Sequence, residues 1–137
     1  MRLPFEEAAF DHVFVCFVLE HLPDPQQFLA TARRLLRPGG RLTVIEGDHG
    51  SAYFHPPGAL AQNLIECQVE LQAKAGGDAK IGRRLFPMIA QAGFQKTRVS
   101  SRNVYVDGSR PRWIEGFTIN TFTAMIKGIE RPSIDTG

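Results

Sequence analysis

The pattern of hydrophobic residues near the N-terminus predicts a buried strand. Residues 10–19 read FDHVFVCFVL, a run that is rich in β-branched and aromatic residues but does not alternate strictly between apolar and polar positions. This pattern is typical of a strand in a parallel sheet that is covered on both faces. We therefore expect a central strand here.

A helix and a second strand follow. Asp24 can cap a helix that begins at Pro25, where a missing N–H has no consequence, and apolar residues recur at helical spacing as far as Leu36. Pro38-Gly39-Gly40 is expected to end the helix, and residues 41–46 (RLTVIE) have the pattern of a second buried strand. The short connections predict one right-handed βαβ crossover.

The rest of the chain predicts a loop, three helices and a further strand. Residues 47–58 are rich in Gly and Pro and lack periodicity, so they are expected to leave the carboxyl end of the second strand as a loop, where ligand sites are common. The elements expected beyond this loop are a helix over 59–75, a helix from Asp78 to about Ala92, a strand near an edge over 97–106 and a helix over 109–128.

Length and composition suit one globular unit. The 137 residues are 43% hydrophobic and 22% charged, which allows a sizeable core and excludes a multi-domain enzyme. We expect a single domain over 1–130 and a tail over 131–137. The longest nearly uncharged apolar run, residues 13–19, is far shorter than the roughly 20 residues that span a bilayer, and no leader precedes it, so we expect a cytoplasmic protein without a membrane partner.

The net charge of +2 hides a local basic segment. Residues 80–112 carry eight Lys or Arg residues and one carboxylate, Asp107, whereas residues 1–79 carry six basic and ten acidic residues. Clustered positive charge can attract an anionic ligand or nucleic acid, and the alternative is a solvated face. We do not expect nucleic acid as a partner because no aromatic stacking ladder accompanies these charges.

An ordered set of short motifs resembles one protein family. Leu3-Pro4-Phe5 precedes Phe10-Asp11, residues 18–22 read VLEHL, and residues 36–40 read LRPGG before a strand. In this order and spacing they resemble the second half of a class I S-adenosylmethionine-dependent methyltransferase. The resemblance implies a partial Rossmann-like α/β fold of about three strands and four helices, S-adenosylmethionine as the cofactor, and methyl transfer to a small-molecule acceptor.

The resemblance also implies which residues lie near the cofactor. Packing in the core is the alternative for Cys16 and Phe17, packing on the first helix is the alternative for Phe5, and capping or bonding to neighbouring groups is the alternative for His21. The implied cofactor-binding residues are Leu3, Pro4, Phe5, Cys16, Phe17 and His21.

The loop after the second strand supplies candidates for the methyl acceptor. Asp48 and His49 are candidates to take a proton from it, because carboxylates and imidazoles suit acid–base work near neutral pH. Glu46, Tyr53 and His55 are candidates to bind it. A polar loop with ordinary hydrogen bonds is the alternative, and Glu46 could equally cap a neighbouring turn. No metal is expected, since the loop has no standard ligand spacing.

The chain also departs from the family. The Gly-rich turn and the acidic residue that hold the cofactor in the family have no counterpart in these 137 residues, which contain no Gly-x-Gly. Three alternatives stay open: a fragment of a full methyltransferase, a half that dimerises, and a non-catalytic dimerising or small-ligand-binding module. An incomplete sheet exposes an apolar edge or face, so we expect a homodimer that covers it.

If the chain forms part of an enzyme, its candidate site residues should lie close together in the fold. We expect two groups to meet at one end of the sheet. They are Leu3, Phe5, Cys16, Phe17 and His21 on one side, and Glu46, Asp48 and His49 on the other.

Overall fold

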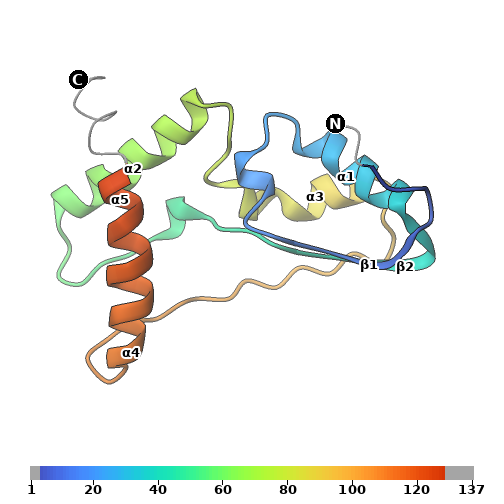
Figure 1. The fold of residues 1–137 in the computed structure, drawn as a ribbon. Helices are drawn as coiled ribbons and strands as arrows, with labels where there is room; N and C mark the ends of the chain where they lie inside the picture. The colour runs from blue at the N-terminus through green and yellow to red at the C-terminus, as the bar shows by residue number, and fades with distance from the viewer. Residues whose placement is uncertain (1–3, 129–137) are drawn as a thin grey trace.

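A parallel pair of strands organises the N-terminal half of the protein. The computed structural model describes residues 4–128. Its sheet consists of β1 (Phe10–Cys16) and β2 (Leu36–Ile45), which are parallel and are joined by helix α1 (Pro25–Leu35) (Figure 1). The strand, helix, strand order and the parallel direction expected from the sequence are confirmed.

Helix α1 begins where the sequence predicts and passes directly into β2. The Asp24 carboxylate accepts a hydrogen bond from the Gln27 N–H at 2.8 Å, and Pro25 occupies the first turn. The C-terminal end differs from the expectation. Leu36 is already extended, so β2 includes Pro38-Gly39-Gly40 instead of beginning after it, and the strand register shifts near Phe10 where this segment pairs.

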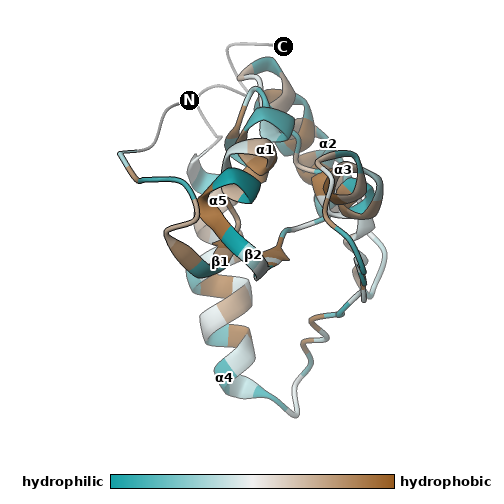
Figure 2. Ribbon diagram, turned by 90° about the vertical axis from the view of Figure 1, so that its right-hand side faces the viewer, coloured by the Kyte–Doolittle hydropathy of each residue, from teal (hydrophilic) through white to brown (hydrophobic). Residues whose placement is uncertain are grey.

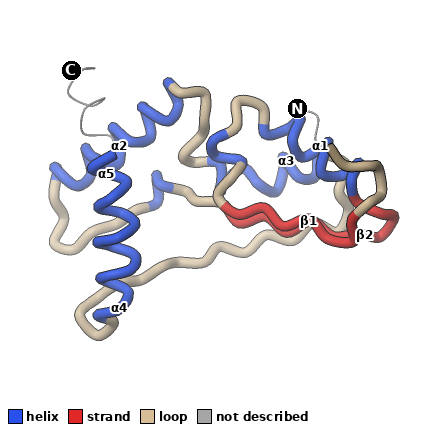
Figure 3. The backbone as a smooth tube through the Cα atoms, viewed as in Figure 1, coloured by secondary structure: helices blue, strands red, loops and turns tan. Residues whose placement is uncertain are grey.

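The hydrophobic core lies on one side of the two strands. The helix expected from Asp78 is divided into a 3-10 turn, η3 (Ile81–Arg84), and helix α3 (Leu85–Gln91). Helices α1 and α3 both lie above the strands (Figures 1 and 3). Their apolar side chains pack with the inward-facing residues of the sheet. The buried core comprises Val15, Leu19, Leu29, Ile81, Leu85 and Met88.

The opposite face of the sheet is open, so the expectation that β1 is covered on both faces is wrong for the described residues. Pairing places Phe14 beside Thr43 and Cys16 beside Ile45. The Phe14 side chain is 59% exposed, and Ile45 is exposed as well. The reason is that both helices pack on the other side and that β1 has only one neighbouring strand among residues 4–128.

The C-terminal half is helical and loosely packed. Helix α2 (Ala59–Lys74) forms as expected, and a C-terminal helical run (111–128) is built from α4 (Pro111–Trp113), the π-helical segment Ile114–Thr123 and α5 (Ala124–Gly128). In Figure 1 this run extends away from the strands, and Figure 2 shows apolar bands along it. No residue of the run is buried. Among residues 4–128, none of the helices has the length and apolar character that crossing a bilayer requires.

The strand expected over 97–106 does not form. Within the described chain these residues belong to no ladder and make no backbone hydrogen bond, and Val99, Val104 and Tyr105 are exposed. A strand needs a partner for its N–H and C=O groups, and no strand among residues 4–128 pairs with this segment. The α/β class is retained, and residues 4–128 contain two strands where about three were expected for the chain. The tail expected over 131–137 lies outside the described residues.

Candidate functional site

The two strands end together and define an edge that we call the carboxyl edge, residues 17–21 and 46–49. The Phe17 N–H donates to the Ile45 carbonyl at 2.8 Å, so the pairing continues one residue beyond β1. Phe17 has a φ of 51°, in the left-handed region that a non-glycine residue rarely adopts. There the chain leaves the strand and enters the 3-10 turn η1 (Leu19–His21), and the Phe17 side chain remains exposed.

Glu46 ties the two halves of the carboxyl edge together. Its Oε1 accepts hydrogen bonds from the Val18 N–H at 3.0 Å and the Leu19 N–H at 2.9 Å, and its Oε2 accepts from the Glu20 N–H at 3.4 Å. These are the contacts of a side chain that caps a turn, one of the two interpretations considered for Glu46. A role in binding the methyl acceptor stays a prediction.

A buried carboxylate, Glu20, lies between two histidines. Its side chain is 7% exposed, with Oε1 3.4 Å from His21 Nε2 and Oε2 3.4 Å from His49 Nε2. The His49 side chain lowers the pKa of Glu20, burial opposes this effect, and the charge of His21 adds to it. The sequence analysis did not select Glu20. The residue stands in the VLEHL motif, but nothing in the motif indicates that its side chain is buried.

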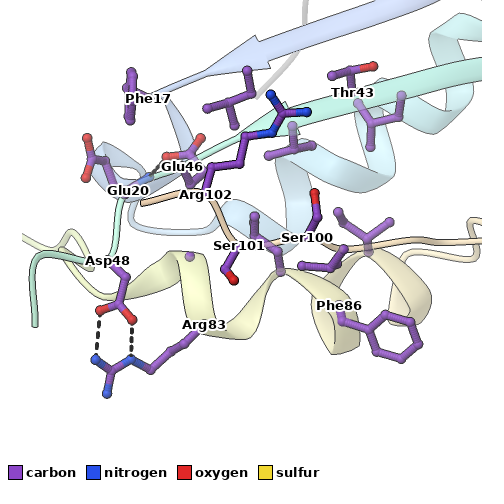
Figure 4. Close-up of a pocket in the computed structure, with 18 of the residues that line it drawn as sticks. Phe17, Glu20, Thr43, Glu46, Asp48, Arg83, Phe86, Ser100, Ser101 and Arg102 are labelled. Carbon is purple, nitrogen blue, oxygen red and sulfur yellow. Dashed lines mark hydrogen bonds and ion pairs between the residues drawn. The ribbon is translucent and has the colours of Figure 1, made fainter. Parts of the chain in front are cut away.

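Asp48 is already engaged. Its two carboxylate oxygens accept hydrogen bonds from Arg83 Nε at 3.0 Å and Nη2 at 2.7 Å (Figure 4). This contact raises the pKa of the Arg83 guanidinium. A carboxylate held in this bidentate pair is less available as a base, which leaves His49 as the stronger candidate of the two. Both roles stay predictions.

The structure gathers some of the expected residues and separates others. Phe17 follows one strand, and Glu46 and Asp48 follow the other (Figure 4). His21 and His49 each lie 3.4 Å from an oxygen of the Glu20 carboxylate. Cys16 is the last residue of β1 and is partly buried. Tyr53 and His55 lie further along the loop toward α2 and are exposed.

Phe5 lies at the opposite end of β1. Its ring packs edge-on against Phe10, the first residue of the strand, with ring centroids 5.2 Å apart. Seven residues of strand place this contact roughly 20 Å from the carboxyl edge. Pro4 precedes Phe5 and is exposed, and Leu3 lies outside the described residues. The expected convergence of all candidates at one end is therefore wrong for Phe5.

A wide cleft runs along the whole of β2 and reaches the carboxyl edge. It has a volume of about 3670 Å³ and is bordered by β2, by the loop after it and by residues 96–108 (Figure 4). Small-molecule sites typically measure about 300–1,000 Å³. A cleft this much larger than a typical site cannot enclose a small molecule closely, and Phe5 lies at the far end of β1. The described residues therefore do not on their own fit a whole S-adenosylmethionine molecule. Within residues 4–128 no three metal-ligating side chains form a group.

Comparison with known proteins finds one protein family and several relatives. Residues 1–44 match the methyltransferase domain family. An uncharacterized 37.1 kDa protein in transposon TN4556 of Streptomyces fradiae is 35% identical over 127 residues, which cover 92% of this chain and 36% of that protein.

Two relatives with named activities match shorter segments. The demethylmenaquinone methyltransferase of Tropheryma whipplei (strain Twist) is 41% identical over 54 residues, 39% of this chain and 23% of that protein. The 27-O-demethylrifamycin SV methyltransferase of Amycolatopsis mediterranei (strain S699) is 46% identical over 44 residues, 32% of this chain and 16% of that protein. The matched segments thus cover between 16% and 36% of the length of these three relatives. The family resemblance seen in the motifs is confirmed.

Proposed function

We propose that this chain supplies one side of a site for S-adenosylmethionine-dependent methyl transfer to a small molecule. The proposal starts from the match of residues 1–44 to the methyltransferase domain family. The part of the site that holds the adenosine portion of the cofactor comes, in this proposal, from residues outside these 137. Cys16, Phe17 and His21 would line the remaining part.

The observation that carries the proposal is the way Glu46 fixes the carboxyl edge. Three backbone N–H groups of the turn after β1 donate to the carboxylate that follows β2. The exposed Phe17 ring and the Glu20–His21 pair are thereby held at the edge where open α/β sheets bind their ligands. The matching family segment contains β1, α1 and most of β2.

The loop after β2 supplies the proposed contacts to the methyl acceptor. His49 is the candidate base, because its imidazole lines the cleft and the Glu20 carboxylate lies beside it. Asp48 is a weaker candidate because of its pairing with Arg83. Tyr53 and His55 are the candidates to bind the acceptor, because both are exposed residues of this loop that line the cleft.

The open sheet face favours a second candidate function. Phe14 and Ile45 are exposed on the face that no helix covers. A non-catalytic module that dimerises or binds a small ligand would bury these side chains without needing the cofactor. A homodimer that covers this face is compatible with both candidates.

A cofactor titration combined with a solution mass separates the two candidates. The 137-residue chain is titrated calorimetrically with S-adenosylmethionine, as is a completed chain in which the segment preceding the matching region of the Tropheryma whipplei relative is joined to residue 1. We expect the 137-residue chain to be a dimer that binds the cofactor weakly or not at all, and we expect clear binding by the completed chain. Phe17→Ala should weaken that binding, whereas Phe14→Ala on the open face should not.

Two results would contradict the proposal. One is nanomolar cofactor binding by the 137-residue chain as a monomer, because the missing half would then be unnecessary. The other is no binding by a completed chain that unfolds cooperatively, a result that supports the non-catalytic module instead.

A further inference from the structure

We propose that Glu20 is a positioning residue for His49. The buried Glu20 carboxylate holds the His49 imidazole by Nε2, which leaves Nδ1 to accept a proton in the cleft. The chemical purpose of this arrangement rests on the proposed methyl-transfer function. The arrangement itself depends only on the contacts of Glu20 and His49.

Glu20 is held in place from three directions. Its N–H donates to Glu46 Oε2 at 3.4 Å, and its carbonyl oxygen accepts hydrogen bonds from the Asp78 N–H at 2.8 Å and from Gln72 Nε2 at 2.9 Å. The side chain is 7% exposed. A carboxylate on so constrained a backbone has little freedom to turn away from its neighbours.

Glu20 Oε2, the carboxylate oxygen nearest His49, depends on His49 for a hydrogen-bond donor. Glu20 Oε2 makes no hydrogen bond of regular geometry within the described part of the chain, and His49 Nε2 lies 3.4 Å from it. A buried carboxylate oxygen without a donor is costly, so the energetically favoured imidazole is the one that carries a proton on Nε2.

The local backbone brings the two groups together. The His49 N–H donates to the Ala79 carbonyl at 2.9 Å, which anchors the start of the turn. Gly47 lies beside the pair, and a Cβ at this position would be 3.3 Å from His49 Nε2 and 3.7 Å from Glu20 Oε2. The absence of a side chain at residue 47 therefore leaves room for the imidazole to approach the carboxylate.

Because Nε2 faces Glu20, the second ring nitrogen of His49, Nδ1, is the one that can accept a proton. Within residues 4–128 no hydrogen bond engages His49 Nδ1, and the imidazole lines the cleft with 24% of its side chain exposed. When a carboxylate fixes the proton on one ring nitrogen, the other nitrogen has a free lone pair. A proton leaving an O–H or N–H of the methyl acceptor would bind Nδ1, its bonding electrons would stay on the acceptor, and Glu20 would stabilise the resulting imidazolium.

The other charged groups around the pair are accounted for. His21 faces the second Glu20 oxygen and is mostly exposed, Asp48 is paired with Arg83, and the Glu46 carboxylate accepts backbone hydrogen bonds. Asp48 is thus a matched control, a carboxylate next to His49 in sequence that does not hold its ring.

The experiment measures which nitrogen of His49 carries the proton. Long-range ¹H–¹⁵N spectra of the labelled 137-residue chain are recorded at a pH where histidines are neutral, with His49→Gln used to assign the signals. We expect the proton on Nε2 alone in the wild type. In Glu20→Gln the side-chain amide can present either its NH₂ donor or its oxygen acceptor to His49 Nε2. We therefore expect the tautomer with the proton on Nδ1 to appear as well. Asp48→Asn should leave the His49 signals unchanged.

A second variant covers the case in which Glu20→Gln does not fold. Gly47→Ala keeps the carboxylate but crowds His49 Nε2, and the second tautomer is again expected. A wild-type His49 with its proton on Nδ1, or spectra that do not change in a folded Glu20→Gln protein, would overturn the proposal. If the tautomer result holds while the completed chain fails to bind cofactor, the pairing stands and only its methyl-transfer purpose is lost.

Discussion

The N-terminal strands with α1 and α3 differ from the C-terminal helical run (111–128) in what their apolar residues contact. Both regions have helical or strand periodicity in the sequence. In the first, Ile81 is fully buried among side chains from β1, α1 and α3. In the second, Ile119 is 54% exposed, and Trp113 and Phe117 are exposed as well. The C-terminal helical run contacts the loop before α2 through the rings of Phe54 and Phe122, which are tilted relative to each other.

The difference shows that periodicity indicates which side of an element is apolar but not whether another layer covers it. Helix α1 obtains its partner layer from the strands directly before and after it in the chain. The C-terminal helical run has no comparable layer within residues 4–128. Large exposed apolar surfaces mark interaction sites, so we expect the apolar residues of this run to form a contact surface.

The largest expected effect compares two isoleucines. Ile81→Ala should lower the free energy of unfolding by about 2–5 kcal/mol, because it leaves a cavity in the core. Ile119→Ala, the matched variant on the C-terminal helical run, should change it by no more than about 0.5 kcal/mol. Urea denaturation of both variants measures the difference. Equal losses would mean that the run is packed in solution, which would remove the contrast between the two regions.

The next effect concerns Glu46. Glu46→Ala removes an ionised acceptor of backbone hydrogen bonds, and the free energy of unfolding should fall by about 1.5–3 kcal/mol. Glu46→Gln keeps one oxygen acceptor and should lose less. Amide hydrogen exchange at Leu19 is the local readout. Unchanged protection of Leu19 in Glu46→Ala would show that Glu46 does not hold the carboxyl edge.

A smaller effect is expected from the helix cap. Asp24→Ala should destabilise the protein by about 1 kcal/mol, because the Gln27 N–H loses its acceptor at the start of a packed helix. Asp107, whose carboxylate accepts from the Ser109 N–H in an exposed turn, provides the comparison. Asp107→Ala should not shift the thermal midpoint measurably. An equal shift in both variants would contradict the division of the molecule into a packed and an uncovered region.

The smallest effect is a pH dependence. The folded pKa of Glu20 is lowered from its ordinary value of 4.5, so its contribution to stability is present above that value and is lost as the pH falls through the lowered pKa. Thermal midpoints of the wild type and of Glu20→Gln should therefore converge as the pH drops below about 4.5. A constant difference down to strongly acidic pH would show that the Glu20 charge does not contribute.

Local signals in the sequence predicted part of this fold and of its site. The Asp24-Pro25 start of α1 and the two strands follow from residues that act on their immediate neighbours, and the motifs placed Phe17, His21 and Glu46 at one edge. The strand expected over 97–106 failed because alternation of side chains says nothing about whether a neighbouring strand exists.

Other features depend on contacts between distant parts of the chain. The backbone carbonyl of Glu20 accepts hydrogen bonds from Asp78 and Gln72, more than fifty residues away, and no local pattern indicates these contacts. Phe5 was assigned to the cofactor by resemblance, and its packing on Phe10 became visible only in the folded chain.

Mapping the cofactor on the completed chain by NMR tests the central claim most directly. The amide spectrum is recorded with and without saturating S-adenosylmethionine. We expect the shifts within the present 137 residues to cluster at 17–21 and 46–49. Shifts centred instead on Phe5 and Phe10, or on the C-terminal helical run, would contradict the assignment of the site to the carboxyl edge.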